Sequence, residues 1–417
     1  MIDHPLAYDV FLYAALPWVV LRLLWRARRE RRYLQHWSER FGWYRASQRA
    51  SQPVIWVHAV SVGETRAAEP LLRALRLRYA DHRILLTHMT PTGRDTGTQL
   101  FGDTVERCYL PYDYPGAARR FLDAFRPRVG VLMETEIWPN LIEACAQRRV
   151  PLYLVNARLS EKSYSRYRRY PRMTRACLRA LSGIAAQTGE DARRFEALQA
   201  EHVSVTGNLK FDVLPPAERV QQGQAWRSRF GARPVLLAAS TREGEESLVL
   251  DAFEAMGLPS ALLVIVPRHP QRFDEVAQLL TQRGVRYQRR SENAPVAPDT
   301  RVLLGDSMGE MFAYYAACDV AFIGGSLLPY GAQNLIEACA VGKPVIIGPH
   351  TYNFAEATEL AIAAGAAVRI DNAQGLADAA RRLLTSEETI QQMGAAALAF
   401  SERHQGAAQR VMELMRF

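Results

Sequence analysis

Short apolar and β-branched runs recur along the chain from Pro53 onward, and they alternate with segments whose apolar residues repeat about every 3.6 positions. The short runs are typical of buried strands and the longer segments of amphipathic helices. In the first half, strands are expected at residues 53–59, 83–89, 105–110, 129–134, 151–156, 183–187 and 202–206. A helix expected at residues 65–80 has an apolar stripe made of Leu71, Leu72, Leu75 and Leu77. This alternation predicts a parallel sheet covered by helices on both faces.

The pattern is interrupted at residues 210–224, where Pro215-Pro216 and a polar run suggest a hinge. It resumes with expected strands at residues 234–240, 261–267, 301–305, 319–325 and 344–348. The fold class is therefore α/β, with two Rossmann-like domains facing across a cleft and ligands expected beyond the carboxyl ends of the strands. We place the domains at residues 46–214 and 215–417, and the last helix could pack back on the first domain.

The amino end, residues 1–45, is expected to be a membrane-associated segment. Residues 10–21 carry no charge, but a spanning helix needs about 20 apolar residues, so Asp9 and Arg22 make spanning marginal. The six arginines between residues 22 and 32 follow the apolar run, which is the reverse of the order in a secretory signal. The positive-inside tendency then keeps the chain after Leu21 in the cytoplasm.

Aromatic and basic side chains surround this apolar segment. The aromatic ones suit the membrane interface, and they are Trp18, Trp25, Tyr33 and Trp37. The clustered arginines suit anionic lipid headgroups. We therefore expect the segment at the cytoplasmic face of a membrane. The alternative is a first helix that packs on the protein body and exposes its arginines to solvent.

The composition also indicates an anionic partner. Lys and Arg number 52 while Asp and Glu number 43, so the net charge of +9 favours nucleic acid, anionic lipid or a phosphorylated substrate. The five cysteines are scattered without a C-x-x-C pair, and the nine histidines lack metal-ligand spacing. We therefore expect a reducing compartment, no disulfide framework and no protein-held metal.

An acid follows the first expected strand in the segment HAVSVGE, residues 58–64. Ser61 and Glu64 form a capping-box pattern that would start the next helix, and Ser307 and Glu310 repeat it. The alternative to helix capping is a catalytic role. An acid at a strand end in a cleft is positioned to act as a general base, because burial can raise its pKa.

A glycine-rich turn follows the strand expected at residues 319–325. Gly324 and Gly325 allow close backbone approach, and a helix is expected to begin near Gln333 and Asn334. Free N–H groups and the helix dipole there would suit a phosphate. Glu337, one turn into the helix, could accept hydrogen bonds from ribose hydroxyls. The spacing differs from the usual NAD and ATP motifs, and a capped helix is the alternative.

Three further segments carry charged residues that have two or more interpretations. Arg268 and His269 directly follow a strand, where they could contact a phosphate or a base, or form a solvated loop. Glu134 and Glu136 are expected at a helix start with Pro139 just inside the first turn, where the dipole favours acids. Residues 162–175 interleave tyrosines with basic residues, which suits nucleic-acid stacking, lipid headgroups or a solvated helix face.

Taken together, these motifs closely resemble the 3-deoxy-D-manno-oct-2-ulosonic acid (Kdo) transferases. The resemblance spans nearly the whole chain and rests on HAVSVGE, METEIWPNL, NARLSEKSY, GNLKFD, VPRHPQRF, GDSMGEM and GGSLLPYGAQNLIEA followed by GKPVIIGPHTYNF. It implies an inverting glycosyltransferase of the GT-B type that moves Kdo from CMP-Kdo to the lipid A precursor, lipid IVA, in lipopolysaccharide biosynthesis. The chain would use no cofactor.

The resemblance also implies roles for individual residues. Glu64 corresponds to the catalytic base, and Glu134 and Lys210 correspond to residues that support the reacting centre. The implied CMP contacts are Arg268, His269, Gly309, Glu310, Met311, Asn334 and Glu337. To these the glycine-rich turn adds Gly325, which could help to stabilise the departing phosphate.

The implied partners are CMP-Kdo, a phosphorylated lipid A precursor and anionic inner-membrane lipid, but not nucleic acid. Two alternatives compete with this interpretation. The first is a nucleotide-sugar 2-epimerase-like enzyme, which needs neither a membrane segment nor a lipid acceptor. The second is a membrane-tethered nucleic-acid-binding protein, which leaves the strand-end acids and the glycine-rich turn unexplained.

Overall fold

The computed structural model describes residues 3–44, 52–415 and 417. The chain forms two compact units: unit 1 comprises Met1–Asp212 with Gln405–Phe417, and unit 2 comprises Val213–His404. Each unit contains one sheet of seven strands, and neighbouring strands run parallel in both sheets. The predicted α/β class with two Rossmann-like sheets is confirmed.

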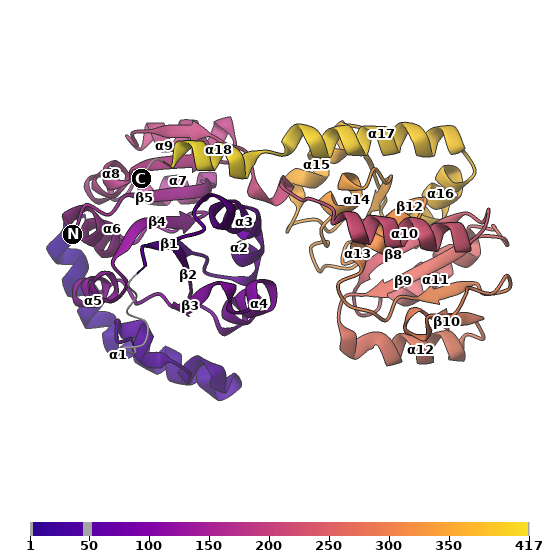
Figure 1. Ribbon diagram of the computed structural model, residues 1–417, viewed down its shortest axis with the longest axis horizontal. Helices are drawn as coiled ribbons and strands as arrows, with labels where there is room; N and C mark the ends of the chain where they lie inside the picture. Colours follow the sequence, from indigo (N-terminus) through magenta and orange to yellow (C-terminus); the bar gives the residue numbers. More distant parts are fainter. Residues whose placement is uncertain (1–2, 45–51, 416) are drawn as a thin grey trace. The chain divides into compact units, whose positions relative to one another are not determined.

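The sheet of unit 1 has the strand order β3-β2-β1-β4-β5-β6-β7. Figure 1 labels β1 to β5 of this sheet. Its strands are β1 (Val54–His58), β2 (Arg83–His88), β3 (Glu106–Tyr109), β4 (Pro127–Met133), β5 (Leu152–Ala157), β6 (Gly183–Ala186) and β7 (Val203–Val205). All seven coincide with the predicted runs. The side chains alternate between two cores, so Trp56 packs on one face of the sheet while Ile55 packs on the other.

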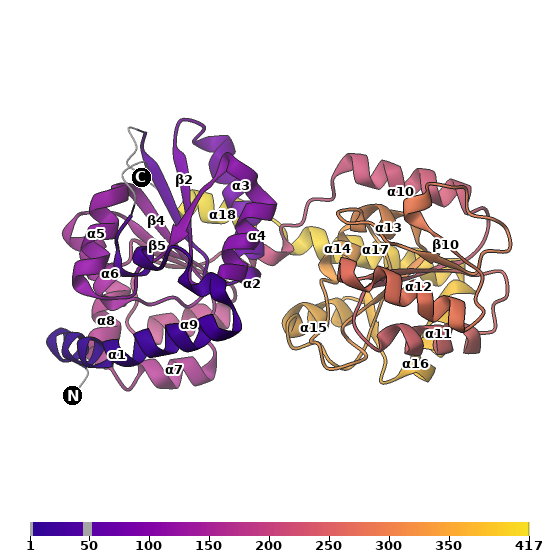
Figure 2. The same ribbon diagram turned by 90° about the horizontal axis from the view of Figure 1, so that it is seen from below.

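Helices cover both faces of this sheet, as Figure 2 also shows. The core around Trp56 is closed by α5 (Pro115–Phe125), α6 (Pro139–Gln147), α8 (Pro171–Ala180) and α9 (Gly189–Ala197). The core around Ile55 is closed by α3 (Glu69–Arg78), α4 (Pro91–Phe101) and α18 (Ala407–Leu414). The shorter elements are α2 (Val62–Ala67), α7 (Glu161–Tyr167), η1 (Arg31–Leu34), η2 (Trp37–Phe41), η4 (Gly102–Thr104) and η5 (Leu209–Phe211).

The segment predicted as one helix over residues 65–80 contains the end of α2 and all of α3. Pro70 has no N–H to continue the ladder of α2, and it occupies the first turn of α3, where a proline is tolerated. Three of the four stripe leucines are buried, but Leu77 is 81% exposed, so its assignment to the stripe was wrong. Leu77 lies two positions after Leu75, which turns its side chain by about 200° to the opposite side of the helix.

The first helix, α1 (Pro5–Arg29), is 25 residues long. Among the residues that the structure describes, it is the single helix long and apolar enough to cross a membrane. Three hydrogen bonds hold it on unit 1: Tyr8 Oη donates to Asp113 Oδ2, Asn140 Nδ2 donates to Asp9 Oδ1, and Tyr114 Oη donates to the Leu12 carbonyl. One side of α1 therefore packs on the protein. Its other side exposes large apolar residues, which include Val10, Phe11, Trp18, Leu21 and Trp25.

The sheet of unit 2 has the order β10-β11-β9-β8-β12-β13-β14. Its strands are β8 (Val235–Thr241), β9 (Leu262–Pro267), β10 (Tyr287–Arg289), β11 (Val302–Leu304), β12 (Val320–Ile323), β13 (Val345–Ile347) and β14 (Ala367–Arg369). The sequence pattern did not predict β10 and β14. Both are three-residue edge strands whose side chains are partly exposed, so neither has a continuous apolar run.

Helices also flank the sheet of unit 2. One face is covered by α11 (Glu245–Ala255), α12 (Phe273–Gln282) and α16 (Ala373–Leu384). The other helices are α10 (Ala217–Arg229), α13 (Met311–Ala317), α14 (Ile336–Ala340), α15 (Ala355–Ala363) and α17 (Glu387–His404), and the short turns are η6 (Pro270–Arg272) and η7 (Arg290–Glu292). Trp226 of α10 packs against Tyr314 of α13 at 5.2 Å between ring centroids.

The carboxyl-terminal helix α18 belongs to unit 1. Val411 and Met412 of α18 join the core that contains Leu71 of α3. The Asp212 carboxylate accepts hydrogen bonds from three backbone N–H groups at the start of α18, those of Gly406, Ala407 and Ala408. Asp212, the last residue of the GNLKFD motif, thus attaches the final helix to unit 1.

Candidate active site

Glu64 lies in the first turn of α2, directly after the carboxyl end of β1. Ser61 is the N-cap residue, and its Oγ accepts from the Glu64 N–H at 3.5 Å. The Glu64 carboxylate accepts in return from Ser61 Oγ at 3.0 Å and from the Val60 N–H at 2.8 Å. The predicted capping pattern is therefore present, except that the carboxylate binds the N–H of Val60 and not that of Ser61.

Glu64 is also an acid with a strongly shifted pKa. Its side chain is 8% exposed, and burial raises its pKa to about 8. The hydrogen bonds from Val60 and Ser61 lower the pKa, while the charges of Glu134 and Glu136 raise it further. A carboxyl group with a pKa near neutrality can take up a proton and release it again.

Glu134 and Glu136 follow β4 in a loop. The helix α6 begins only at Pro139, so the prediction that both acids start a helix was wrong. Glu134 has a left-handed φ of +59°, and its N–H donates to the Val155 carbonyl at 2.9 Å. Burial raises the pKa of Glu136, whose carboxylate accepts from Trp138 Nε1 at 2.7 Å. Three acidic side chains thus gather at the carboxyl ends of β1 and β4.

Lys210 lies in η5, a turn that contacts α2. Two asparagine side chains hold the backbone of this turn. Asn208 Oδ1 accepts from the Lys210 N–H at 3.0 Å, and Asn156 Oδ1 accepts from the Leu209 N–H at 3.0 Å. Because Asn156 lies at the carboxyl end of β5 beside β4, unit 1 brings Glu64, Glu134 and Lys210 to the same edge of its sheet.

In unit 2, the glycine-rich turn after β12 is held by a buried carboxylate that the sequence did not indicate. Glu245 is 0% exposed, and its carboxylate accepts from the N–H groups of Gly325, Leu327 and Arg242 at 2.5, 3.0 and 2.8 Å. Gly325 has φ of +70°, a conformation that glycine adopts without strain. The Gly325 N–H is therefore bonded to Glu245 and is not a free donor.

Arg268 and His269 directly follow β9. The Arg268 N–H donates to the Thr241 carbonyl at 3.0 Å, and its Nε donates to Gln333 Oε1 at 3.2 Å. Burial lowers the pKa of His269, and the charges of Arg242, Arg268 and Arg272 lower it further. The ends of β8 and β9 are therefore positively charged, which suits a phosphate.

Gly309 and Glu310 lie between β11 and α13, and Met311 is the first residue of α13. Ser307 does not cap α13, because Glu310 is its N-cap residue, so the second predicted capping pattern was wrong. The Glu310 carboxylate instead accepts from Ser307 Oγ, Gln222 Nε2 and Arg290 Nη2. Gly309 has φ of +75° and open space where a side chain would lie, and Met311 begins the helix.

The helix after the glycine-rich turn, α14, begins at Ile336 and not near Gln333 and Asn334 as predicted. Asn334 Oδ1 accepts from the Ile336 N–H at 3.0 Å, and Asn334 Nδ2 donates to Glu337 Oε1 at 3.2 Å. Gln333, which the sequence did not indicate, links this turn to Arg268. Unit 2 thus brings Arg268, Gly325, Asn334 and Glu337 together around the carboxyl ends of β9 and β12.

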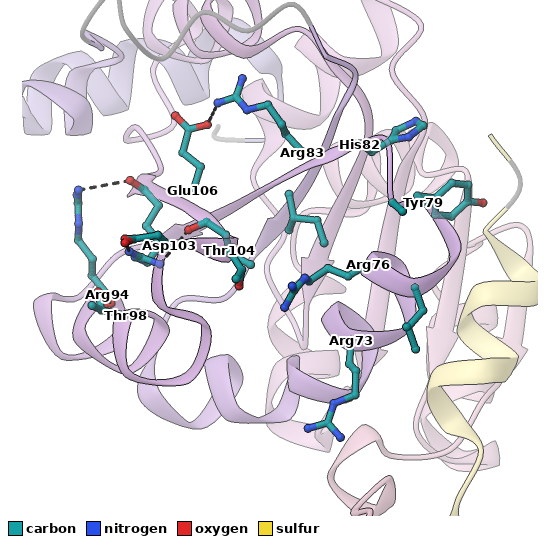
Figure 3. A pocket seen from close by; sticks show the side chains of 15 residues that line it. Arg73, Arg76, Tyr79, His82, Arg83, Arg94, Thr98, Asp103, Thr104 and Glu106 are labelled. Carbon is teal, nitrogen blue, oxygen red and sulfur yellow. Dashed lines mark hydrogen bonds and ion pairs between the residues drawn. The ribbon is translucent and has the colours of Figure 1, made fainter.

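A hollow of about 1100 Å³ lies elsewhere in unit 1, beside the amino ends of β2 and β3 (Figure 3). Its lining is basic and includes Arg73 and Arg76 of α3 with Arg107 of β3. Several of its charges are already paired, as in the ion pair between Arg83 and Glu106. None of the candidate site residues lines it, so it is separate from the carboxyl edge where they gather.

Two parallel Rossmann-like sheets with positively charged strand ends are the fold class of the GT-B glycosyltransferases. A sequence model of glycosyl transferases group 1 matches residues 247–400, and one of 3-deoxy-D-manno-octulosonic-acid transferase (kdotransferase) matches residues 35–213. The chain belongs to the 3-deoxy-D-manno-octulosonic acid transferase family.

Similar proteins support this assignment. The 3-deoxy-D-manno-octulosonic acid transferase of Bordetella pertussis is 46% identical over 94% of this chain and 95% of the relative. The transferase of Haemophilus influenzae is 37% identical over 92% of each chain. UDP-GlcNAc 2-epimerase from Neisseria meningitidis, solved with UDP-GlcNAc, shares the fold at a TM-score of 0.57, with 16% identity over 87% of this chain and 99% of that chain.

The resemblance inferred from the motifs is therefore confirmed, and the protein is a glycosyltransferase. The likeness to the epimerase extends to the fold alone, since the sequences share 16% of their residues. Family membership sets aside both alternatives, the epimerase-like enzyme and the membrane-tethered nucleic-acid-binding protein.

The raised pKa of Glu64 predicts that Glu64→Gln stabilises the protein more at pH 8 than at pH 5. In the unfolded chain Glu64 ionises near pH 4.5, and in the folded protein near pH 8. Between these values the folded state binds the extra proton, so wild-type stability falls as pH rises, by on the order of 3 kcal/mol. Thermal unfolding of both proteins from pH 5 to 8 measures the effect. If the difference in stability between the wild type and Glu64→Gln does not change with pH, the raised pKa is contradicted.

Glu245→Gln is expected to destabilise the full chain by on the order of 2 kcal/mol. The amide nitrogen of glutamine would face backbone N–H donors, so at least one buried donor would lose its acceptor. The matched control is Glu243→Gln, an exposed acid two residues away, which should change stability by less than about 0.5 kcal/mol. Urea unfolding followed by tryptophan fluorescence distinguishes them, and equal midpoints would show that the turn does not need the carboxylate.

Proposed function

We propose that this enzyme transfers Kdo from CMP-Kdo to a phosphorylated lipid A precursor, lipid IVA, with inversion at the anomeric carbon. The observation that carries the proposal is Glu64, a buried carboxyl group at the carboxyl end of β1 whose pKa is raised to about 8. Family membership supports Kdo as the sugar. A base whose pKa lies near the working pH is suited to accept a proton from a hydroxyl group as that group attacks.

The proposed reaction is one direct displacement. An acceptor hydroxyl oxygen bonds to the anomeric carbon while the bond from that carbon to the CMP phosphate oxygen breaks. The hydroxyl proton passes to the Glu64 carboxylate, and CMP leaves as its phosphate anion. Glu134 supports this step because its charge raises the pKa of Glu64, and the Lys210 ammonium offsets developing negative charge.

Residues 215–417 are proposed to bind the donor. The guanidinium of Arg268, near Arg242 and Arg272, suits the CMP phosphate, and the Glu337 carboxylate suits ribose hydroxyls. Gly325 is proposed to allow close approach of the backbone, while its N–H stays on Glu245. Further donor contacts are proposed at His269, Gly309, Glu310, Met311 and Asn334.

Residues 46–214 are proposed to bind the acceptor. The exposed arginines of α7 and α8 suit its phosphate groups, and Tyr167 of α7 donates to the carbonyl of Thr135, beside Glu134 and Glu136. The exposed apolar side of α1 and the arginines after it are proposed to contact anionic lipid at the cytoplasmic face of the inner membrane.

The transfer assay uses freshly generated CMP-Kdo with labelled sugar and purified lipid A precursor. Glu64→Gln is expected to lower the rate at least ~100-fold, because a general base is lost. The wild-type rate is expected to rise with pH up to about 8, as the Glu64 carboxyl group ionises. The matched control is Glu69→Gln on α3, which should keep the wild-type rate. Equal rates for Glu64→Gln and wild type would leave Glu64 as a helix cap, and no transfer by the wild type would contradict the proposed reaction.

The proposed membrane contact predicts that charges on the exposed side of α1 release the protein from lipid. In the double variant Leu21→Glu and Trp25→Glu, binding to vesicles with anionic lipid should fall at least ~10-fold, because two exposed apolar side chains that would enter the lipid are lost. Leu77→Glu, on an exposed leucine of α3, is the matched control and should bind like the wild type. Vesicle sedimentation measures both. Unchanged binding of the double variant would contradict the contact through α1.

A further inference from the structure

Asn156 occupies a bulge at the carboxyl end of β5. The register of β5 against β6 shifts between Val155 and Ala157, so Asn156 is the extra residue. It has a left-handed φ of +55°, and its side chain is 0% exposed. Asparagine tolerates this backbone conformation better than most residues, but a buried amide is costly unless it is hydrogen-bonded.

The Asn156 side chain is bonded at one end. Its Oδ1 accepts from the N–H of Leu209, the residue before Lys210. Its Nδ2 has no hydrogen-bond partner within the described part of the chain. A buried donor without a partner costs about 1–3 kcal/mol. Stability alone therefore does not account for an asparagine at this position.

A second amide joins Asn156 to the same turn. Gln187 Nε2 donates to the Asn156 carbonyl at 2.8 Å, and Gln187 Oε1 accepts from Asn208 Nδ2 at 3.1 Å. Asn208 Oδ1 in turn accepts from the Lys210 N–H. The backbone on both sides of the Leu209–Lys210 peptide is thus tied to the bulge by side-chain amides, whose bonds strengthen one another in a buried setting.

The residue before the bulge holds the other loop. The Val155 carbonyl accepts from the Glu134 N–H at 2.9 Å. Since the bulge separates Val155 from Ala157 in the ladder, adjacent residues of β5 bind two different loops. One of these loops carries Glu134 and the other carries Lys210.

We propose that Asn156 is a positioning residue, which sets Lys210 relative to Glu134 at the reacting centre. This inference rests on the proposed function, because it takes Glu134 and Lys210 as the supporting residues. A displacement of about 1 Å at a reacting centre can lower the rate by a large factor. We therefore expect that removal of the Asn156 side-chain amide lowers kcat because it displaces Lys210.

Two substitutions separate the hydrogen bond from the backbone conformation. Asn156→Gly keeps the left-handed φ but removes Oδ1, and it should lower kcat about 10-fold with little change in the KM for CMP-Kdo. Asn156→Asp keeps an acceptor oxygen, so its kcat should stay within about 3-fold of the wild-type kcat. His202→Gly, at an exposed left-handed position of unit 1 with φ of +56°, is the matched control.

A double-mutant cycle with Lys210→Ala decides whether Asn156 acts through Lys210. Asn156→Gly should lower kcat when Lys210 is present, but change it by less than about 2-fold once Lys210 is alanine. Equal losses in both backgrounds would mean a general structural role and overturn the proposal. A wild-type kcat for Asn156→Gly, or for Lys210→Ala, would overturn it as well.

Hydrogen exchange supplies a readout that does not depend on transfer. The Leu209 amide should exchange faster in Asn156→Gly and keep its protection in Asn156→Asp, because only the glycine variant lacks the acceptor. If the Leu209 amide of Asn156→Gly exchanges at the wild-type rate, the proposal is overturned, whatever kcat this variant has. If the wild type transfers no Kdo, the proposed function fails, and the exchange at Leu209 still decides whether Asn156 holds this turn.

Discussion

Buried side-chain oxygens that bind backbone N–H groups hold the loops at the carboxyl edge of each sheet. A loop that leaves a parallel strand has donors with no ladder partner, and each one needs an acceptor. The Glu64 carboxylate accepts from the Val60 N–H, and Asn156 Oδ1 accepts from the Leu209 N–H. The Glu245 carboxylate accepts from N–H groups of the glycine-rich turn. Because these oxygens are buried, water competes little for the donors, and the loops are fixed. These bonds hold the start of the helix that carries Glu64, the turn that carries Lys210 and the glycine-rich turn.

The fold was largely predictable because a strand buried on both faces leaves a continuous apolar run. In the described part of the chain, apolar or β-branched runs marked twelve of the fourteen strands, including the largely exposed β7, and missed β10 and β14. These two lie at sheet edges, where one side meets solvent, and polar residues such as Gln288 replace the apolar run. The same reasoning failed at Leu77, since a leucine in a helical segment need not face the core.

The site was predictable only in part. Motifs placed acids and basic residues at strand ends, and parallel strands bring such ends to one edge of a sheet. The residues that hold the loops were missed, because Asn156, Glu245 and Gln333 act through single hydrogen bonds that leave no periodic pattern. Pro139 lies in the first turn of α6 as predicted, but Glu134 and Glu136 lie in the loop before it, and α14 begins two residues after Asn334. Local propensity does not show how long a strand-end loop must be.

Glu64 shows how one group can cap a helix and still change its protonation state. Its two oxygens have different partners, the Val60 N–H on Oε2 and the Ser61 hydroxyl on Oε1. A backbone N–H can only donate, whereas a hydroxyl can donate or accept. When Oε1 is protonated, its O–H can therefore donate a hydrogen bond to Ser61 Oγ, while Oε2 still accepts from the Val60 N–H. The start of α2 can then stay in place whether the Glu64 carboxyl group is protonated or ionised, so helix capping does not exclude a change of its protonation state.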